Sequence, residues 1–330
     1  MNHILNGPVT RVALCSGLAL VLLPLVTGSA SMSIEIVVFA TAVLGANLLL
    51  GFTGLMSFAQ GAFFGVGAYV AGLLRVEVDA GMLAVIVASG LAGAVASAVV
   101  GWISIRRQGI YFVMLTLAFA QLFYFLAYAF PGITGGENGL QGVSRPSLAL
   151  GPFEIAPVTS NTGYYIFAAS LFLILSMAVA RVIHSPFGQV LLAIRENERR
   201  ASATGYDVRV FKIIAFAIAG ALAGIAGALQ AMFVGLASIS NVEILMSQEI
   251  LMMSIIGGAN SLAGALVGSG FVVAVSSVLS TWWPRWLLLL GLILMVVVLY
   301  FPGGLVGAAR SLVARLKSGR PAPSSKGGLR

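Results

Sequence analysis

Four polar residues stand inside segments that are otherwise long and apolar, namely Ser57, Gln60, Gln121 and Glu249. Such side chains can exchange hydrogen bonds with a polar solute, and at membrane depth they are costly unless a partner or an aqueous cavity receives them. We therefore predict that they line a path through the membrane. The alternative is that Ser57 and Gln60 only bond to neighbouring helices, and that Glu249 reaches an interface because its segment is short.

Charge gathers at residues 184–212 of a chain in which only 8% of the residues are charged. The charged residues there are Arg195, Glu196, Glu198, Arg199, Arg200, Asp207, Arg209 and Lys212. This segment must be held in water. Ser185 and Pro186 are typical of the start of a helix, and Gly205 is typical of its end. The spacing predicts one helix of roughly five turns.

The apolar residues of this predicted helix recur at helical spacing, at Phe187, Val190, Leu191 and Ile194. One interpretation is an interfacial helix that lies on anionic lipid. The other is a docking helix that sits in the groove of a soluble partner. The pattern alone leaves both interpretations open.

Residues for catalysis, metal binding or nucleotide hydrolysis form no usable pattern. None of the three lysines, Lys212, Lys317 and Lys326, follows a glycine, so the chain has no GxxxxGK(S/T) phosphate-binding loop. The two histidines, His3 and His184, fit neither a metal cluster nor a Ser-His-Asp arrangement. We predict a protein that is not an enzyme, with no catalytic residues, no metal and no cofactor of its own.

The elements that position these residues are membrane-spanning helices. Hydrophobic residues make up 59% of the chain, the mean hydropathy is +1.04, and apolar runs near twenty residues match a hydrocarbon core of about 30 Å. We predict an all-α polytopic transmembrane bundle of about ten spans. The predicted spans are residues 12–30, 34–51, 55–75, 81–103, 109–129, 162–183, 211–234, 244–258, 261–280 and 286–302.

Some of these spans are predicted to be discontinuous. Residues 51–69 place five glycines around Ser57 and Gln60, which is typical of a broken helix that lines a cavity. Segment 244–258 is short and must cross as a broken helix if the charges are to fall on the correct sides.

Basic residues set the predicted orientation. Ten crossings put both termini on one side, and that side then carries fifteen of the eighteen Lys and Arg, leaving Arg75, Arg145 and Arg285 on the other. The positive-inside rule makes the basic side cytoplasmic, so the net charge of +8 is an orientation signal and no nucleic-acid partner is expected. Residues 1–30 also resemble a cleavable signal peptide, and the sequence leaves their removal open.

The predicted domain organisation is a transmembrane domain, residues 1–302, followed by a cytoplasmic, disordered tail, residues 303–330. An outer loop spans residues 130–161, whose glycines predict either a defined loop or a plain surface connection. Three pairs of glycines at i and i+4 predict close helix packing, or helices that rock during transport; they are Gly61 and Gly65, Gly220 and Gly224, and Gly264 and Gly268.

Several motifs together resemble a known family. They are TGLMSFAQGAFFGVGAY (53–69), TGGENGLQG (134–142), SPFGQVLLAIRENERRASATGYDVRVFKIIAFAIAGALAGIAGAL (185–229), GGANSLAGALVGS (257–269) and FPGGLVG (301–307). In these motifs and their order the chain resembles the LivM type of permease subunit from bacterial ABC importers of branched-chain amino acids.

The resemblance implies a bacterial inner-membrane permease that works by alternating access. It also implies two cytoplasmic ATPase subunits, a homologous second permease subunit and a periplasmic substrate-binding protein, with membrane lipid around the bundle. Segment 184–212 would dock onto an ATPase, with Gly205 matching the glycine of the family's EAA-type loop. The residues expected to transmit ATPase movement are Arg195, Glu196, Glu198, Arg199 and Gly205.

The sequence departs from the family pattern in two places. Gln60 stands where many relatives have histidine, and Arg199-Arg200-Ala201 replaces Glu-Ala-Ala. One alternative function is a related importer of urea or short amides, because the motifs are shared. Another is a secondary transporter or channel that works alone, which predicts buried ion-coupling charges on several spans, and Glu249 is nearly the only such residue.

Overall fold

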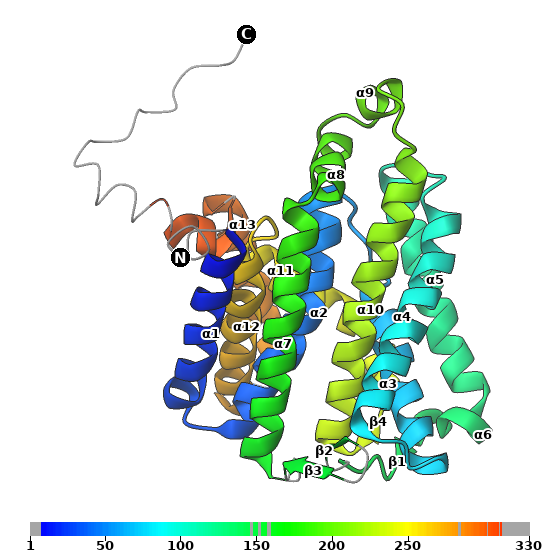
Figure 1. Cartoon of the computed structure of the whole chain (residues 1–330), viewed down its shortest axis with the longest axis vertical. Coiled ribbons are helices and arrows are strands. Elements are labelled where there is room, and N and C mark those ends of the chain that lie inside the picture. The colour runs from blue at the N-terminus through cyan, green and yellow to red at the C-terminus, as the bar shows by residue number, and fades with distance from the viewer. Residues whose placement is uncertain are drawn as a thin grey trace.

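The computed structural model describes residues 8–145, 148–150, 153–156, 160–282, 285–301, 303–309 and 311. This part of the chain folds into a bundle of helices (Figure 1). The helices are α1 (Pro8–Thr27), α2 (Ala30–Asn47), α3 (Gln60–Glu77), α4 (Met82–Ser104), α5 (Ile110–Ala129), α6 (Pro131–Thr134), α7 (Asn161–His184), α8 (Pro186–Glu196), α9 (Glu198–Ala203), α10 (Val208–Val234), α11 (Ile244–Gly257), α12 (Leu262–Trp282) and α13 (Trp286–Tyr300). The strands are β1 (Leu140–Gln141), β2 (Leu148–Leu150), β3 (Phe153–Ala156) and β4 (Leu236–Ala237).

Each predicted span coincides with a helix, which confirms the all-α polytopic bundle. Within the described residues, six helical stretches are long and apolar enough to cross a membrane: Ala30–Thr53, Met82–Ser104, Ile110–Ala129, Asn161–His184, Val208–Val234 and Leu262–Thr281. Shorter apolar stretches run through α1, α11 and α13. The count of ten crossings stays a prediction. Disorder was predicted for residues 303–330, but residues 304–309 are helical, and the chain after residue 311 lies outside the described residues.

The predicted break between the second and third spans is present. Helix α2 continues into a π-helical turn, Leu48–Thr53, and Gly54 then takes a left-handed conformation with φ of 72°. The chain is irregular up to Ala59, and α3 begins at Gln60. A positive φ is inexpensive for glycine, so Gly54, which is exposed beside Arg195, ends the helix.

Helix α10 lies at the centre and packs against α4, α3 and α2. Its contact with α4 is close because small residues face each other. A Cβ added at Gly220 would lie 2.0 Å from Oγ of Ser97, and one added at Gly224 would lie 2.4 Å from the carbonyl oxygen of Ser89. The close packing predicted from this glycine pair is confirmed.

Replacing Gly224 with leucine is expected to destabilise the bundle by about 3 kcal/mol, the upper end for overpacking, because backbone would have to move. Thermal unfolding of the detergent-purified protein measures the loss. Gly291→Leu is the matched control, since nothing lies within 4 Å of a Cβ at that position on α13. Equal melting temperatures for the two variants would contradict the close contact.

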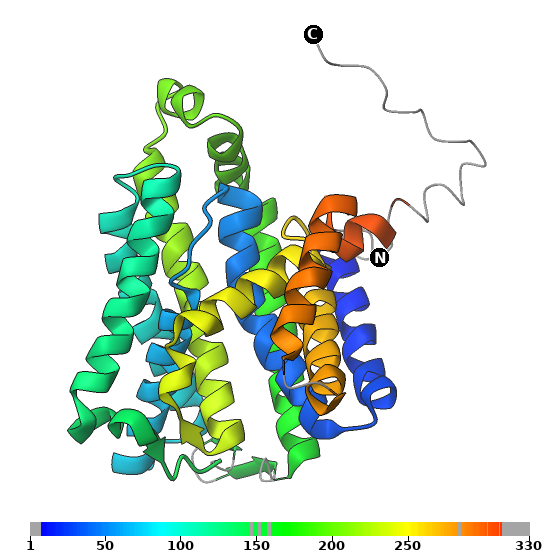
Figure 2. The same ribbon diagram turned by 180° about the vertical axis from the view of Figure 1, so that it is seen from behind.

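The segment after α10 returns into the bundle before it becomes helical. Strand β4 and a 3-10 turn, Ile239–Asn241, lead to α11, which has 14 residues and so is about 21 Å long. Figure 2 shows α11, in yellow, running obliquely from mid-depth toward the end of the molecule that carries α8 and α9. Helix α11 is unbroken, so the break predicted within residues 244–258 is absent, and a membrane crossing by this segment stays a prediction.

The described residues of the loop after α5 adopt a specific, hydrogen-bonded structure. Strand β1 pairs antiparallel with β4, and Gly135, Gly136 and Gly139 all have positive φ. Arg145 then donates to the carbonyl oxygens of Met232 and Phe233 at the end of α10, at 3.3 and 2.7 Å. A cation at the carboxyl end of a helix is favourable, so Arg145 ties this loop to α10.

Candidate functional site

A small cavity lies where the broken helix meets α11. Its wall is made of Ala46, Leu49, Leu50, Leu55, Ser57, Gln60 and Leu251. The side chains are mostly apolar, and the space holds about one water molecule. The structure therefore brings two of the four predicted path residues, Ser57 and Gln60, to one cavity.

Gln60 is the polar group of this cavity without a bonding partner. Gln60 is 1% exposed, and neither its Oε1 nor its Nε2 has a hydrogen-bond partner within the described part of the chain. A buried, unpaired carboxamide is costly, so the amide is available to a guest molecule. Ser57 differs, because its Oγ accepts from the N–H of Ala59 at 3.3 Å and so helps to shape the start of α3.

The start of α3 is held inside the bundle by neighbouring hydroxyls. The N–H of Phe58 donates to Oγ1 of Thr116 at 3.2 Å, and the N–H of Gly61 donates to Oγ of Ser247 at 2.8 Å. A helix that begins here directs the positive end of its dipole at the cavity, next to Gln60. The site therefore offers an amide, a helix N-terminus and an apolar wall.

The other two predicted path residues lie away from this cavity. Gln121 is half-buried on α5 and Glu249 is half-buried on α11, and neither lines the cavity wall. Glu249 stands two positions before Leu251, so the two side chains leave α11 in different directions. The carboxylate of Glu35 on α2 repels that of Glu249.

Asn47 connects α2 to α11 and to the loop after it, a role that the sequence did not predict. Its amide bonds to the carbonyl oxygen of Ser261 at 3.2 Å, and its Oδ1 accepts from Oγ of Ser254 at 2.6 Å. The available signal was a carboxamide near the end of the apolar span 34–51.

The charged segment forms two helices instead of one. Helix α8 ends at Glu196, Asn197 is extended with φ of −158°, and α9 follows. The predicted five-turn helix is wrong because Asn197 caps a second helix, its Oδ1 accepting from the N–H of Arg200 at 3.0 Å. Ser185 does precede α8, but its hydroxyl donates to the carbonyl of Val182 at 2.7 Å and does not cap α8.

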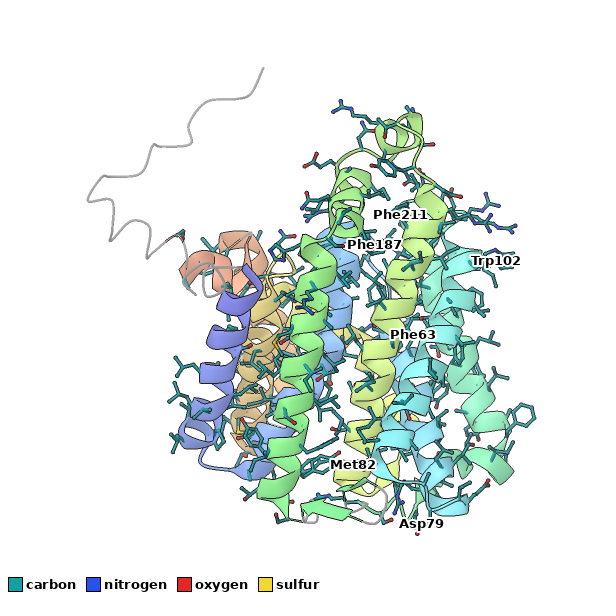
Figure 3. All side chains as sticks on the ribbon, viewed as in Figure 1. Phe63, Asp79, Met82, Trp102, Phe187 and Phe211 are labelled. Carbon is teal, nitrogen blue, oxygen red and sulfur yellow. The ribbon has the colours of Figure 1, made fainter. Side chains whose placement is uncertain are left out.

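The apolar stripe of α8 faces the chain itself. Val190 and Ile194 are buried with Ala201 and Val208 in a small separate core, against which the half-buried Phe211 packs. The ring of Phe187 stacks on that of Phe211 with 5.4 Å between centroids, and Figure 3 labels both residues at this end of the bundle. The stripe is therefore not the surface that lipid or a partner's groove would receive, and docking of the segment through its other residues stays a prediction.

Helix α9 ends at Gly205, as predicted. Gly205 has φ of 92° and its N–H donates to the carbonyl of Ser202 at 3.0 Å, while the N–H of Tyr206 reaches the carbonyl of Ala201 at 3.4 Å. This pair of bonds is the Schellman motif.

Replacing Gly205 with valine is expected to raise the free energy of the folded segment by about 1–2 kcal/mol, because a β-branched residue is strained at positive φ. A Cβ at this position meets nothing within 4 Å, so the whole effect is conformational. Hydrogen exchange across residues 198–207 measures the local loosening, and the ratio of ATP hydrolysed to solute imported measures uncoupling. Gly205→Asn should lose less, and equal losses would contradict the conformational explanation.

The five residues expected to transmit movement fall into two groups. Glu196, Arg199 and Gly205 are exposed at the tip of the segment. Arg195 and Glu198 make bonds within the chain: Arg195, which is also exposed, donates to the carbonyl of Gly51 and to Oδ1 of Asn260, and Glu198, which is half-buried, pairs with Lys212 at 2.6 Å. The first group is free to contact a partner, and the second group braces the segment.

Residues 28–299 match the family model described as "Branched-chain amino acid transport system / permease component", which covers most of the chain. The chain belongs to this permease family. Among curated relatives, the permease is 26% identical to the "High-affinity branched-chain amino acid transport system permease protein LivM" of Salmonella typhimurium, over 89% of this chain and 73% of that protein. The LivM protein of Escherichia coli is 27% identical over 84% and 69%. No solved structure matches.

The permease is also similar to a second kind of subunit. The LivH protein of Escherichia coli is 26% identical over 74% of this chain and 82% of its own length. The resemblance to LivM-type permeases inferred from the motifs is thereby confirmed, and the permease is a multi-pass membrane protein.

Proposed function

We propose that this chain is the membrane-spanning subunit of an ATP-driven importer, and that it moves branched-chain amino acids into the cytoplasm by alternating access. The observation that carries the proposal is the unpartnered Gln60 amide in an apolar cavity at a helix break. An apolar wall suits an aliphatic side chain, and the helix N-terminus suits a carboxylate.

Ser57 and Gln60 contact the solute when this cavity, which has space for about one water molecule in the present conformation, widens during transport, and Gln121 and Glu249 contact it elsewhere along the path. The chain itself performs no catalysis and carries no cofactor or metal. ATP is bound and hydrolysed by two cytoplasmic ATPase subunits. A homologous second permease subunit completes the pore, and a periplasmic binding protein delivers the solute. The protein resides in the bacterial inner membrane with both termini and segment 184–212 in the cytoplasm.

Docking to the ATPases is the role of the exposed residues at the tip, with Glu196 and Arg199 in contact with the partner. Charged, solvent-exposed residues of this kind set orientation and partner choice. Gly205 ends α9, the helix whose first turn carries Arg199.

Uptake by proteoliposomes that contain the whole complex tests this proposal. ATP-dependent accumulation of leucine, isoleucine or valine is the expected result. Accumulation of urea or acetamide instead would favour the related importer, for which the Gln60 carboxamide is itself a complementary partner. Uptake by this chain without ATPase subunits would overturn the importer function in favour of a stand-alone transporter or channel.

A further inference from the structure

Arg195 connects the charged segment to the membrane helices. It lies in the last turn of α8, and its guanidinium Nη1 donates both to the carbonyl oxygen of Gly51 and to Oδ1 of Asn260, the latter at 2.6 Å. Its side-chain stem passes close to Gly54, where an added Cβ would lie 3.1 Å from Cγ of Arg195. One side chain therefore joins α8, the π-helical turn and the loop between α11 and α12.

The Gly51 carbonyl suits a cationic partner. The N–H of Leu55 bonds back to the carbonyl of Leu49 at 3.1 Å, and Gly54 then turns the chain away. Gly51 thus belongs to the last turn of a helix, where carbonyl groups lack intrahelical donors and carry the negative end of the dipole. A guanidinium supplies the missing donor there with a charge-assisted bond.

The loop that carries Asn260 is seated on the same turn. A Cβ at Gly51 would lie 2.1 Å from the carbonyl oxygen of Ala259, so backbone packs on backbone. Asn47 adds a second connection, through its bonds to Ser254 and Ser261. Three elements that are far apart in the sequence therefore meet at one junction.

This junction adjoins the cavity. Leu49 and Leu50 of the π-helical turn line it, and so does Leu251 of α11. Movement of the turn relative to the loop would change the wall between the cavity and the end of the molecule that carries α8.

We propose that Arg195 is a latch that holds the cavity closed toward the α8 end, and that displacement of α8 and α9 releases it. The inference rests on the proposed function, because an ATPase partner supplies the displacement. Arg195 is a positioning residue, since it bonds to Asn260 and to Gly51, the neighbour of the wall residue Leu50, and does not itself line the cavity. The latch explains why this arginine, although exposed, bonds to the membrane helices.

Labelling of a single cysteine in the cavity tests the latch. In the complete complex, Leu251→Cys is combined with Cys15→Ser, which removes the only native cysteine of this chain, and labelling of this subunit by a membrane-impermeant methanethiosulfonate is followed in inside-out vesicles without ATP. Asn260→Ala should speed labelling about tenfold, the ratio that one charge-assisted hydrogen bond is worth, and Arg195→Ala, which loses two such bonds, should speed it more. Asn260→Asp should slow labelling, because the carboxylate pairs more strongly with the guanidinium.

The opposite signs at position 260 separate a latch from a merely structural contact, since general loosening would speed labelling in both variants. Arg181→Ala is the matched control, an exposed arginine in the last turn of α7 outside the junction, and should leave the rate unchanged. If the Arg195→Ala variant does not insert into the membrane, the comparison of Asn260→Ala with Asn260→Asp still tests the latch. Unchanged labelling in Arg195→Ala, or faster labelling in Asn260→Asp, would overturn the latch and leave the transport assignment intact, because labelling does not depend on the solute.

Discussion

Replacing Gln60 with leucine is expected to reduce uptake at least tenfold while the melting temperature stays the same or rises. The volume of the side chain is nearly kept, but the cavity loses its unpartnered amide. A hydrogen bond between uncharged groups is worth about 1 kcal/mol and one to a charged group about 1.5–3 kcal/mol, so loss of a bond to a charged solute corresponds to tenfold or more. Removing a buried amide that has no partner in the protein relieves an unfavourable term, so stability does not fall.

Initial rates of ATP-dependent uptake and thermal unfolding of the same preparation measure the two effects. Gln230→Leu is the matched control: Oε1 of Gln230 on α10 is also buried without a partner within the described residues, but Gln230 does not line the cavity. The control should therefore share the effect on stability and keep normal uptake. Loss of uptake in both variants, or in neither, would contradict a role for Gln60 in the path.

Replacing Glu198 with alanine is expected to be the most destabilising single change in the charged segment. Lys212 is 3% exposed, and its Nζ lies 2.6 Å from Oε2 of Glu198, so the variant leaves a buried ammonium without its partner. Breaking a fully buried pair costs about 3–5 kcal/mol. The side chain of Glu198 is 33% exposed, so screening reduces the expected loss to about 2 kcal/mol.

The double variant Glu198→Ala with Lys212→Met should recover most of that loss, since an apolar pair removes the uncompensated charge. Unfolding temperature and the ratio of ATP hydrolysed to solute imported are the measurements, because loosening of α9 from α10 should also uncouple the complex. Glu196→Ala is the control, an exposed glutamate two positions earlier, and should change stability by less than about 0.5 kcal/mol. A Glu198→Ala variant as stable as this control would rule out the brace.

The helices and their break were predictable because the signals are local. Apolar runs of the right length place the spans, and glycines around Ser57 and Gln60 predict the discontinuity. The glycine pair on α10 predicted a close contact, although its partner helix was not predictable. The prediction of one helix for the charged segment was wrong because of a single residue. Asn197 has a modest helix propensity but is a strong N-cap, and the neighbouring sequence does not indicate whether it continues a helix or starts a new one.

By itself, the sequence determined that this chain is an all-α membrane bundle, where its helices lie, and which family it belongs to, because length, hydropathy and motif order act over neighbouring residues. Only the tertiary structure decided what the polar residues do. It left Gln60 unpaired in a cavity, kept Gln121 and Glu249 away from that cavity, and placed Arg195 against Gly51, 144 positions earlier. Such pairings depend on how helices pack, and packing is set by side-chain shape and backbone approach across the whole bundle.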